Sequence, residues 1–570
     1  MTHPDHPEHP AGDPSRDEPA PARGDPASPA PAAGRGEPAP DGAGLSRRQF
    51  LRWAGLAGGY WVAASAGLTA WLARPRPAGA AGGRPAGPAA AGSAGSTGEG
   101  GTAEAGPAWE VTPGLGEPAR GRLQADVVVI GAGFAGLAAA RDLARAGRDV
   151  LLLEARRRVG GRVLNHPLGS GKVVEVGGQW VGPTQDRILA MAKEVGVGTF
   201  PTYNTGQYVD YRNGRLTRYD GRIPTSDPAA YAEAAAALAL LDRMAWQVPL
   251  DKPWTAPRAR EWDGQTFATW MRDHLATPGG RELVRLAIQA VFACEPEDVS
   301  LLHVLFYVHS AGSLERLVNT AGGAQERRFV GGSQRVAERV AQRLGRRVRP
   351  ASPVQRIRQG RWGVAVEGEG FRVEARRVIV AMAPTLTGRL QYDPPLPGWR
   401  DQLTQRVPQG SVIKVQCVYD RPFWRDDGLA GQATSDTGPV KVTFDNSPPD
   451  GRPGVLLGFI EGDDARVAAR WDARTRRRRV IECFVRYFGP KAALVRQYIE
   501  RDWSQDPWTR GCYAGYFPPG VWTAYGHALR EPIGRIHWAG TETALIWNGY
   551  FDGAVRSGED AARAVLRLRD

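Results

Sequence analysis

The chain has 570 residues, of which 42% are hydrophobic and 23% charged, with a formal net charge of +13 at pH 7. This length is greater than that of a domain with one simple hydrophobic core, and it allows roughly two to four domains. The positive charge is mainly scattered arginine. Its densest run, residues 474–479, has no interleaved aromatic residues or nucleic-acid motif, so a solvated helix surface is favoured over nucleic-acid binding. The spacing of the four cysteines predicts neither a disulfide framework nor a zinc site.

The N-terminal region has the features of an export signal. Residues 1–44 are mostly Pro, Ala, Gly and charged residues, and we expect them to be disordered. Residues 45–80 match a twin-arginine signal, with Arg47-Arg48 ahead of a charge-free stretch and a small-residue cleavage site after Ala80. Cleavage is favoured, although an apolar segment of about 21 residues could also remain as an anchor. Residues 81–120 read as a flexible linker, and we expect an extracellular or cell-envelope location.

A dinucleotide-binding pattern opens the folded part of the chain. A short β-branched run, residues 126–130, predicts a buried parallel strand, and a helical stretch follows to about residue 146. Between them lies a glycine-rich turn whose expected cofactor contacts are Gly131, Gly133, Ala135 and Gly136. Such a turn lets the backbone approach a pyrophosphate at the helix N-terminus. Glu154, at the end of the second strand, is placed to accept hydrogen bonds from a ribose.

The segment after Glu154 indicates FAD rather than NAD. Residues 155–162, Ala-Arg-Arg-Arg-Val-Gly-Gly-Arg, resemble the second fingerprint of two-domain FAD enzymes. Arg156, Gly161 and Arg162 are therefore expected beside the cofactor. Arg162 is predicted to contact a phosphate, because a guanidinium fork suits phosphate oxygens.

Further blocks resemble one family in the correct order along the chain. They are residues 175–187, residues 322–332, residues 410–414 with 422–424, residues 511–520, and residues 539–550. On these blocks the chain is identified as a member of the flavin monoamine oxidase family over residues 122–567. The resemblance implies an α/β two-domain fold, in which a Rossmann-like FAD domain is joined to a substrate domain with a mixed sheet and helices.

The implied amine oxidase domain spans residues 121–570 and is discontinuous. Its FAD-binding parts are expected at about 122–200, 320–390 and 530–567, and its substrate-binding parts at about 201–319 and 391–529. Within the latter, residues 226–315 show helical spacing of apolar positions. Residues 410–460 read as strands, with Val412, Lys414 and Gln416 on one face and the intervening residues on the other. One face of this sheet is expected to line the substrate cavity.

The resemblance also implies the chemistry. The family oxidises a primary, or also a secondary, amine to an imine and then an aldehyde, releasing ammonia and H2O2 with O2 as acceptor. Tyr513 and Tyr550 match the family's two tyrosines that flank the amine as an aromatic cage. Lys414 matches the lysine that holds a water at the flavin and assists oxygen activation. It is a rare lysine in an arginine-rich chain, and arginine would not replace its compact amine.

The remaining cofactor contacts follow from the same blocks. Positions expected to touch FAD are Gly178, Gln179, Trp180, Val354, Trp503, Thr541 and Glu542. Cys512 matches the cysteine that joins the flavin 8α-methyl group through a thioether in membrane-bound animal members. A covalent bond is favoured, although microbial relatives often hold FAD non-covalently and Cys512 could be a buried free thiol.

The substrate class is constrained by residues 177–180, where amino acid oxidases of this superfamily carry a carboxylate-clamping arginine and this chain has none. An amine without a carboxylate is therefore expected. Val318 and Val442 match the family's entrance gates and are small, which favours bulky arylalkyl amines, and Gln325 is expected to line the same cavity. No metal, nucleic acid or C-terminal membrane anchor is expected, and the enzyme could form a homodimer.

Other readings stay open at this stage. A putrescine or polyamine oxidase and an L-amino acid oxidase share the fold, and a non-catalytic amine-binding flavoprotein would keep it as well. Intact Lys414, Tyr513 and Tyr550 favour catalysis.

Overall fold

The computed structural model describes residues 107–220 and 226–568. The expected N-terminal extension, the signal segment and the first part of the linker lie outside these residues. All described residues belong to one compact unit, Ala94–Asp570. The linker was expected to be flexible up to residue 120, but residues 107–120 are packed on the domain. Ala119 and Thr112 are buried, and their backbone amides donate hydrogen bonds to Ser352 Oγ (2.8 Å) and the Arg157 carbonyl (3.2 Å).

The larger sheet has eight strands and a parallel centre. Strand β1 (Gly121–Ile130) pairs in parallel with β2 (Val150–Leu153) on one side and with β13 (Phe371–Ala381) on the other. The order is β10-β2-β1-β13-β12-β11-β14, and β20 pairs in parallel with the end of β13. The other strands are β10 (Val348–Arg349), β11 (Val354–Gln359), β12 (Val364–Gly368), β14 (Gln391–Asp393) and β20 (Ile536–Ala539).

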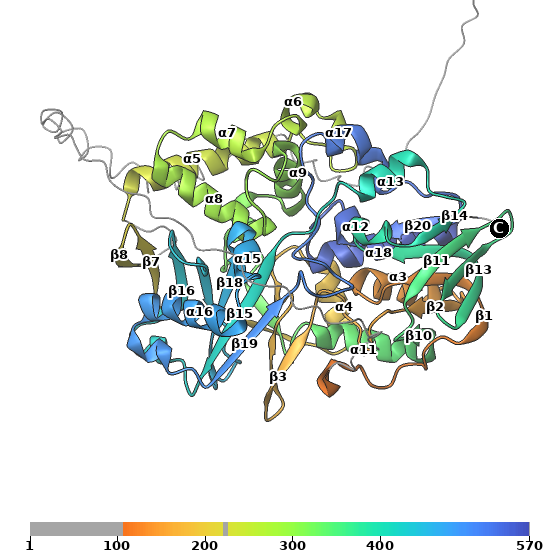
Figure 1. Cartoon of the computed structure of the whole chain (residues 1–570), viewed down its shortest axis with the longest axis horizontal. Helices are drawn as coiled ribbons and strands as arrows, with labels where there is room; N and C mark the ends of the chain where they lie inside the picture. The colour runs from red at the N-terminus through yellow and green to blue at the C-terminus, as the bar shows by residue number, and fades with distance from the viewer. Residues whose placement is uncertain (1–106, 221–225, 569–570) are drawn as a thin grey trace, which may run out of the picture. The chain divides into compact units, whose positions relative to one another are not determined.

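Helices α3 (Phe134–Arg145), α4 (Asp186–Glu194), α11 (Gln334–Leu344) and α18 (Phe551–Arg567) pack beside this sheet (Figure 1). The approach of α18 to α3 is close because Gly558 has no side chain. A Cβ at that position would lie 2.0 Å from the Ala135 carbonyl oxygen. Chain segments from the two ends of the folded domain thus share one core, and they position the turn between β1 and α3.

The second sheet has seven strands in the order β19-β15-β18-β17-β16-β7-β8. Every residue of β15 (Val412–Tyr419) and β18 (Gly454–Glu461) is buried, because these strands lie between a cavity and the helix α16 (Ala473–Phe488). The predicted alternation is confirmed. Ile413, Val415 and Cys417 pack in the core with α16, whereas Val412 and Lys414 line the cavity. The other strands are β7 (Gln207–Arg212), β8 (Arg215–Tyr219), β16 (Leu429–Ser435), β17 (Val442–Asp445) and β19 (Gln497–Asp502).

The region predicted as helical contains a helical cluster over the second sheet (Figure 1). Its helices begin at side chains that accept a backbone hydrogen bond, such as Asp227, Thr277 and Ser300, as expected for N-caps. The helices are α5 (Pro228–Ala245), α6 (Ala259–Asp263), α7 (Phe267–His274), α8 (Pro278–Phe292), α9 (Leu301–Ala311) and α10 (Leu314–Val318).

The remaining elements are short. The strands are β3 (Asn165–Gly169), β4 (Lys172–Glu175), β5 (Trp180–Val181), β6 (Thr199–Pro201) and β9 (Arg327–Phe329). The helices are α12 (Pro384–Thr387), α13 (Gly398–Thr404), α14 (Phe423–Asp426), α15 (Gly462–Ala468) and α17 (Val521–Tyr525). The 3-10 turns are Ala108–Glu110, Pro253–Thr255, Gly345–Arg347, Pro490–Ala493, Gly526–Leu529 and Thr541–Thr543.

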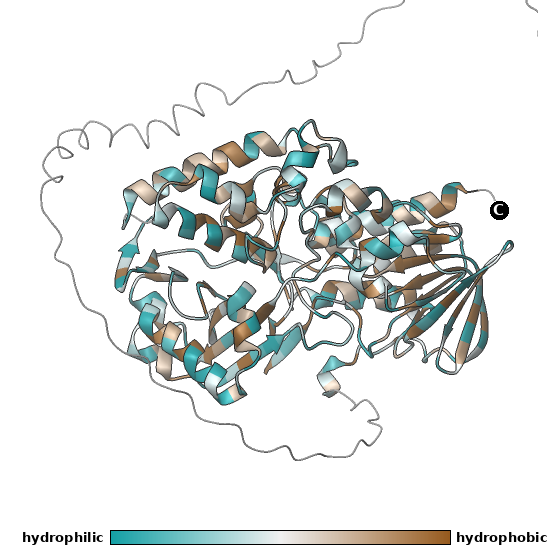
Figure 2. Ribbon diagram, turned by 45° about the horizontal axis from the view of Figure 1, so that its top comes forward, coloured by the Kyte–Doolittle hydropathy of each residue, from teal (hydrophilic) through white to brown (hydrophobic). Residues whose placement is uncertain are grey.

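Hydrophobic residues run along the strands of the larger sheet, while exposed helices alternate between hydrophobic and hydrophilic residues (Figure 2). Within residues 107–220 and 226–568, no helix is both long and apolar enough to cross a bilayer.

Candidate active site

One cavity of about 1130 Å³ is lined by residues of both sheets and of the helical cluster. Pockets for small ligands are typically about 300–1,000 Å³, so this volume suits a large cofactor together with a small substrate. Its walls include nearly all residues predicted for the site. Two are not on the wall: Gly136 lies under the glycine turn and Glu542 lies behind Arg162.

The glycine turn is built to leave space for a ligand. A Cβ on Gly136 would lie 1.8 Å from the Gly131 carbonyl oxygen, so this position packs the turn itself. A Cβ on Gly133 would meet nothing within 4 Å, and Gly133 lines the cavity at the start of the 12-residue helix α3. A helix N-terminus with open space in front of it suits a pyrophosphate. The turn therefore fits the predicted dinucleotide.

The carboxylate of Glu154 stabilises this turn by accepting backbone hydrogen bonds. Its two carboxylate oxygens accept hydrogen bonds from the backbone amides of Ala132 (2.7 Å) and Arg156 (2.9 Å). The side chain is buried and also lines the cavity. Each carboxylate oxygen can accept a second bond, so the arrangement leaves room for the predicted ribose contact.

Arg162 is held by a protein carboxylate that the sequence did not indicate as its partner. Its guanidinium donates two hydrogen bonds to the carboxylate of Glu542, of 2.6 and 3.1 Å, and one of 3.0 Å to the backbone oxygen of Tyr513. Arg162 also lines the cavity and keeps further N–H donors, so its predicted phosphate contact stays a prediction, while the buried Glu542 receives the counter-charge that it requires. Burial alone would raise the pKa of Glu542, and the Arg162 charge overrides it, so that this pKa lies below its ordinary value.

Arg156 also binds a protein carboxylate, which sequence analysis did not identify. One guanidinium nitrogen donates hydrogen bonds of 2.5 Å to Asp506 and of 2.5 Å to Thr509. Asp506 accepts a further bond of 2.9 Å from Arg501. These contacts hold the segment that contains Pro507 and Thr509 against the cavity wall. No local pattern marks Asp506, since its partner is 350 residues away in the chain.

Lys414 is buried on strand β15 of the second sheet, and it lines the same cavity as the glycine turn of the larger sheet. Its Nζ donates a hydrogen bond of 2.7 Å to the Gly177 backbone oxygen and another to Gln179 Oε1. It also lies 5.8 Å from the Trp180 ring centroid and 5.6 Å from that of Phe459. Burial lowers the pKa of Lys414 to about 7. The amine can therefore exist in either protonation state near neutral pH.

A buried polar network fixes Gln179 and hence Lys414. Gln179 Nε2 donates to Asn446 Oδ1 (2.8 Å), and Asn446 Nδ2 donates to Gln416 Oε1 (2.8 Å). Gln416 in turn donates to the backbone oxygen of Glu175 (3.0 Å), whose carboxylate accepts a bond of 2.6 Å from Arg328. Chains of satisfied buried hydrogen bonds hold one geometry. Sequence analysis found Gln179 but not Asn446 or Arg328.

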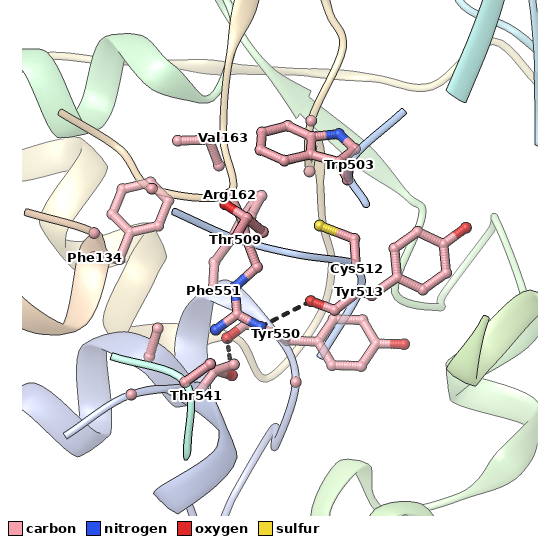
Figure 3. Close-up of a pocket in the computed structure, with 18 of the residues that line it drawn as sticks. Phe134, Arg162, Val163, Trp503, Thr509, Cys512, Tyr513, Thr541, Tyr550 and Phe551 are labelled. Carbon is pink, nitrogen blue, oxygen red and sulfur yellow. Dashed lines mark hydrogen bonds between the residues drawn. The ribbon is translucent and has the colours of Figure 1, made fainter. Parts of the chain in front are cut away.

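Tyr513 and Tyr550 lie together at one end of the cavity. Their rings point the same way, away from Arg162 and Thr541 (Figure 3). The backbone oxygen of Tyr513 accepts a hydrogen bond from Arg162, and that of Tyr550 accepts one of 2.8 Å from Thr541 Oγ1. Residues predicted beside the cofactor thus hold both tyrosines. Tyr307 of α9, which was not predicted, lies 6.1 Å from Tyr550 between ring centroids.

Glu461 is the main functional residue that sequence analysis missed. It is buried at the end of β18, lines the cavity, and accepts a hydrogen bond of 2.6 Å from the Tyr513 hydroxyl. Burial raises the pKa of Glu461 to about 8. Its only sequence signal is an acidic residue that ends an otherwise apolar run, Gly454–Ile460.

Cys512 also lines the cavity, and its sulfur lies beside the Trp503 side chain (Figure 3). The Trp503 indole is fixed by a hydrogen bond of 2.8 Å to the Val176 backbone oxygen. All four cysteines are free thiols in the structure, and of these Cys512 alone is on the cavity wall. Burial raises the pKa of Cys512 to about 12, which Arg162 partly offsets.

The predicted gate residues are on the wall as well. Val318, at the end of α10, is 37% exposed, and Val442 begins β17. Gln325 lines the cavity and donates a hydrogen bond of 2.9 Å to the Leu317 backbone oxygen, while its own buried side-chain oxygen has no hydrogen-bond donor. Val354 of β11 lines the cavity from the larger sheet.

This architecture defines a class of protein. A dinucleotide-binding sheet and a sheet that carries a buried lysine and an aromatic slot share one cavity, as in a flavoprotein that oxidises a small molecule beside its cofactor.

Comparison with known proteins gives the family. Residues 134–566 match the family model described as flavin containing amine oxidoreductase. The chain is 44% identical over 443 residues to the protein AofH of Mycobacterium tuberculosis, covering 78% of this chain and 97% of that protein. It is 40% identical over 446 residues to the flavin-containing amine oxidase B of Homo sapiens, covering 77% of this chain and 86% of that protein.

Solved structures agree with these relatives. A putrescine oxidase bound to putrescine matches with a TM-score of 0.76 at 35% identity, covering 78% of this chain and 100% of that chain. The cyclohexylamine oxidase from Brevibacterium oxydans IH-35A matches with a TM-score of 0.75 at 33% identity, covering 77% of this chain and 98% of that chain. The chain belongs to the flavin-containing amine oxidase family, and it is an FAD-dependent enzyme that oxidatively deaminates amines with O2 as acceptor.

Proposed function

We propose that this enzyme oxidises primary arylalkyl amines that carry no carboxylate, at the slot between Tyr513 and Tyr550. The observation that carries the proposal is that the described wall at the substrate end of the cavity offers no arginine to a substrate carboxylate. Glu461, an acid, bonds to the cage tyrosine. Among the described wall residues contributed by β15–β18 and α8–α10, none is an arginine. A substrate carboxylate would meet no clamp there, and Glu461 would repel it only above the raised pKa of about 8, where the Glu461 carboxyl is ionised.

The walls support an apolar substrate body. Leu283, Leu286 and Ala287 of α8 line the cavity, and Phe444 and Phe459 line it from the facing sheet. Burying an aryl group against such surfaces is favourable by about 25 cal/mol per Å² of apolar area. The small gate Val318 leaves access to this space.

FAD, when bound, takes up the two electrons and the hydrogen lost from the amine carbon and passes the electrons to O2. The chain supplies position and electrostatics. Tyr513 and Tyr550 hold the neutral amine between two ring faces. Gln179 and the Gly177 backbone oxygen accept hydrogen bonds from the Lys414 amine and fix it between the predicted cofactor end and the substrate end of the cavity. There Lys414 can bind a water and place a positive charge where oxygen is reduced.

A covalent link between Cys512 and the flavin is part of the proposal. Its support is the position of the sulfur on the cavity wall beside Trp503. The buried thiol is neutral at physiological pH, so its proton would have to leave before the thioether could form. The new C–S bond would replace the S–H bond and one C–H bond of the flavin methyl group, and the two electrons released would reduce the flavin, which O2 would reoxidise.

Export by the twin-arginine route is also proposed, on the Arg47-Arg48 motif and the apolar segment after it. Expression of the full chain with Arg47→Lys and Arg48→Lys together should retain the enzyme in the cytoplasm, whereas the unchanged chain should reach the envelope or medium. Equal distribution of the two chains would overturn the proposed route.

The substrate proposal is tested by kcat/KM for phenethylamine, tyramine, putrescine and L-phenylalanine, with H2O2 and ammonia as readouts. We expect the two arylalkyl monoamines to be turned over best and L-phenylalanine to be poor. A preference for putrescine would favour the diamine oxidase alternative, which the likeness to a putrescine oxidase supports. A preference for L-phenylalanine would overturn the argument from the cavity wall.

A further inference from the structure

Glu461 lies on the same face of the second sheet as the active-site lysine. In the antiparallel register of β15 and β18, Lys414 pairs with Phe459, and Val412 pairs with Glu461. Because alternate residues of a strand share a face, these four side chains stand side by side on the cavity wall. Glu461 is therefore part of the substrate end of the cavity rather than of the core behind the sheet.

The carboxyl group of Glu461 is only partly satisfied by the protein. One oxygen accepts the bond from the Tyr513 hydroxyl, and no described residue donates a hydrogen bond to the other oxygen, which is not among the buried polar atoms without a partner and so is open to the cavity. The charged neighbours are paired elsewhere: Lys441 binds Asp464 at 2.6 Å, and Glu295 binds Arg285 at 3.0 Å. The second carboxyl oxygen of Glu461 is therefore available to a donor in the cavity, either water or a group of the substrate.

The reacting nitrogen is not that partner. In the proposed function it lies between the ring faces of Tyr513 and Tyr550, and the Tyr513 ring points away from Arg162 and Thr541, which are predicted to touch FAD (Figure 3). Glu461 is bonded to the Tyr513 hydroxyl and so lies beyond the cage, a phenol ring's length from the reacting centre. A substrate group that reaches Glu461 must be a different part of the molecule.

We propose that Glu461 is a specificity-determining residue, whose free carboxyl oxygen accepts a hydrogen bond from a second donor on the substrate, a hydroxyl or a further amino group remote from the reacting nitrogen. This inference rests on the proposed function and deepens it. The substrate class becomes a primary amine with an apolar body and one such donor.

The test compares substrates that differ only by the donor. The pairs are tyramine with phenethylamine, 2-amino-1-phenylethanol with phenethylamine, and putrescine with butylamine, each measured as a ratio of kcat/KM in the full-length, FAD-loaded enzyme. In the unchanged enzyme we expect at least one donor-bearing substrate to be favoured about tenfold, as one charge-assisted hydrogen bond allows. In Glu461→Leu that ratio should fall to about one, and Glu461→Gln should give an intermediate value.

Tyr513→Phe is the matched control, because it removes the same hydrogen bond but leaves the Glu461 carboxyl in the cavity. It should keep the donor preference while lowering kcat/KM for both members of a pair. Equal losses for both members in Glu461→Leu would assign Glu461 to positioning Tyr513 and would overturn the specificity role. So would the absence of any donor preference in the unchanged enzyme.

The arms of the test separate the possible donors. If Glu461→Leu removes the kcat/KM preference within a hydroxyl-bearing pair, the donor is a hydroxyl. If it removes the preference only within the putrescine pair, the donor is a second amine. In that case the arylalkyl part of the proposed function is wrong, while the role of Glu461 stands. Anaerobic bleaching of the flavin by phenethylamine in every variant reports amine oxidation independently. Its loss in the unchanged enzyme would count against the proposed function and not against Glu461 alone.

Discussion

The Lys414 amine donates a hydrogen bond of 2.7 Å to the backbone oxygen of Gly177, which lies 237 residues earlier in the chain. This bond joins strand β15 of the second sheet to the segment that follows β4, where Gly178, Gln179 and Trp180 are predicted to touch FAD. The lysine is thereby fixed between the predicted cofactor and substrate ends of the cavity.

The first prediction concerns oxidation of the reduced enzyme by O2. Because burial lowers the pKa of Lys414 to about 7, the amine is protonated below this pH and neutral above it. A positive charge favours the reduction of O2, so we expect the reoxidation rate to fall as pH rises through about 7. Lys414→Met should lower this rate on the order of 10²-fold and abolish its pH dependence.

The measurement is rapid mixing of the amine-reduced enzyme with O2 over a pH series. The rate of anaerobic reduction by the amine is the control and should change far less in Lys414→Met. A pH dependence near 7 that persists in this variant would assign the titration to another group.

The second prediction separates the two tyrosines of the cage. Tyr513 donates a hydrogen bond to Glu461, whereas no described residue bonds to the Tyr550 hydroxyl. Tyr513→Phe should therefore lower kcat/KM by about three- to tenfold, as loss of one hydrogen bond predicts, and Tyr550→Phe should have a smaller effect. Replacing either ring with Leu should cost more than its Phe variant, because the ring faces hold the amine. Equal effects of the two Phe variants would argue against the Glu461 contact.

The third prediction concerns the flavin bond. After acid precipitation, the unchanged protein should retain the mass of FAD, and Cys512→Ala should not. The variant should still bind FAD while native, because the glycine turn and the Glu154 region do not involve the sulfur. Intact-mass spectrometry measures both, and release of all FAD from the unchanged protein would show that the thiol is free.

The fourth prediction uses two glycines of one turn. Gly136→Ala would place a methyl group 1.8 Å from the Gly131 carbonyl oxygen. It should therefore lower the free energy of unfolding by about 3 kcal/mol or more, the upper end of the usual cost of overpacking. Gly133→Ala meets no protein atom within 4 Å and has a negative φ of −75°, so the protein should fold normally. Its methyl group projects into the space assigned to the pyrophosphate, and FAD affinity should fall roughly tenfold or more.

Thermal unfolding and FAD titration distinguish these outcomes. If Gly133→Ala bound FAD as tightly as the unchanged protein, the pyrophosphate would lie elsewhere in the cavity.

Much of the site could be predicted because its signals are local. The turn after β1 needs glycines at fixed spacing, so Gly133 can be predicted from the sequence. Strand β15 alternates between a core face and a cavity face, so the position of Lys414 can be predicted as well. Nearly all predicted positions do lie on one cavity wall.

What could not be predicted depends on pairs that only the tertiary fold brings together. Arg162 bonds to Glu542 across 380 residues, a pairing that no local pattern in the sequence indicates. Glu461 carries no motif, and its importance comes from burial and from the Tyr513 hydroxyl. The packing of residues 107–120 likewise depends on partners such as Ser352, so their composition alone suggested a linker.

Amine oxidation by the bound flavin can be measured by mixing the FAD-loaded, full-length enzyme with phenethylamine in the absence of O2. We expect the visible absorbance of the oxidised flavin to be lost, and to return when O2 is admitted, with one H2O2 formed for each flavin reoxidised. A protein that binds no FAD, or one whose flavin absorbance is unchanged by phenethylamine, tyramine and putrescine alike, would contradict this expectation.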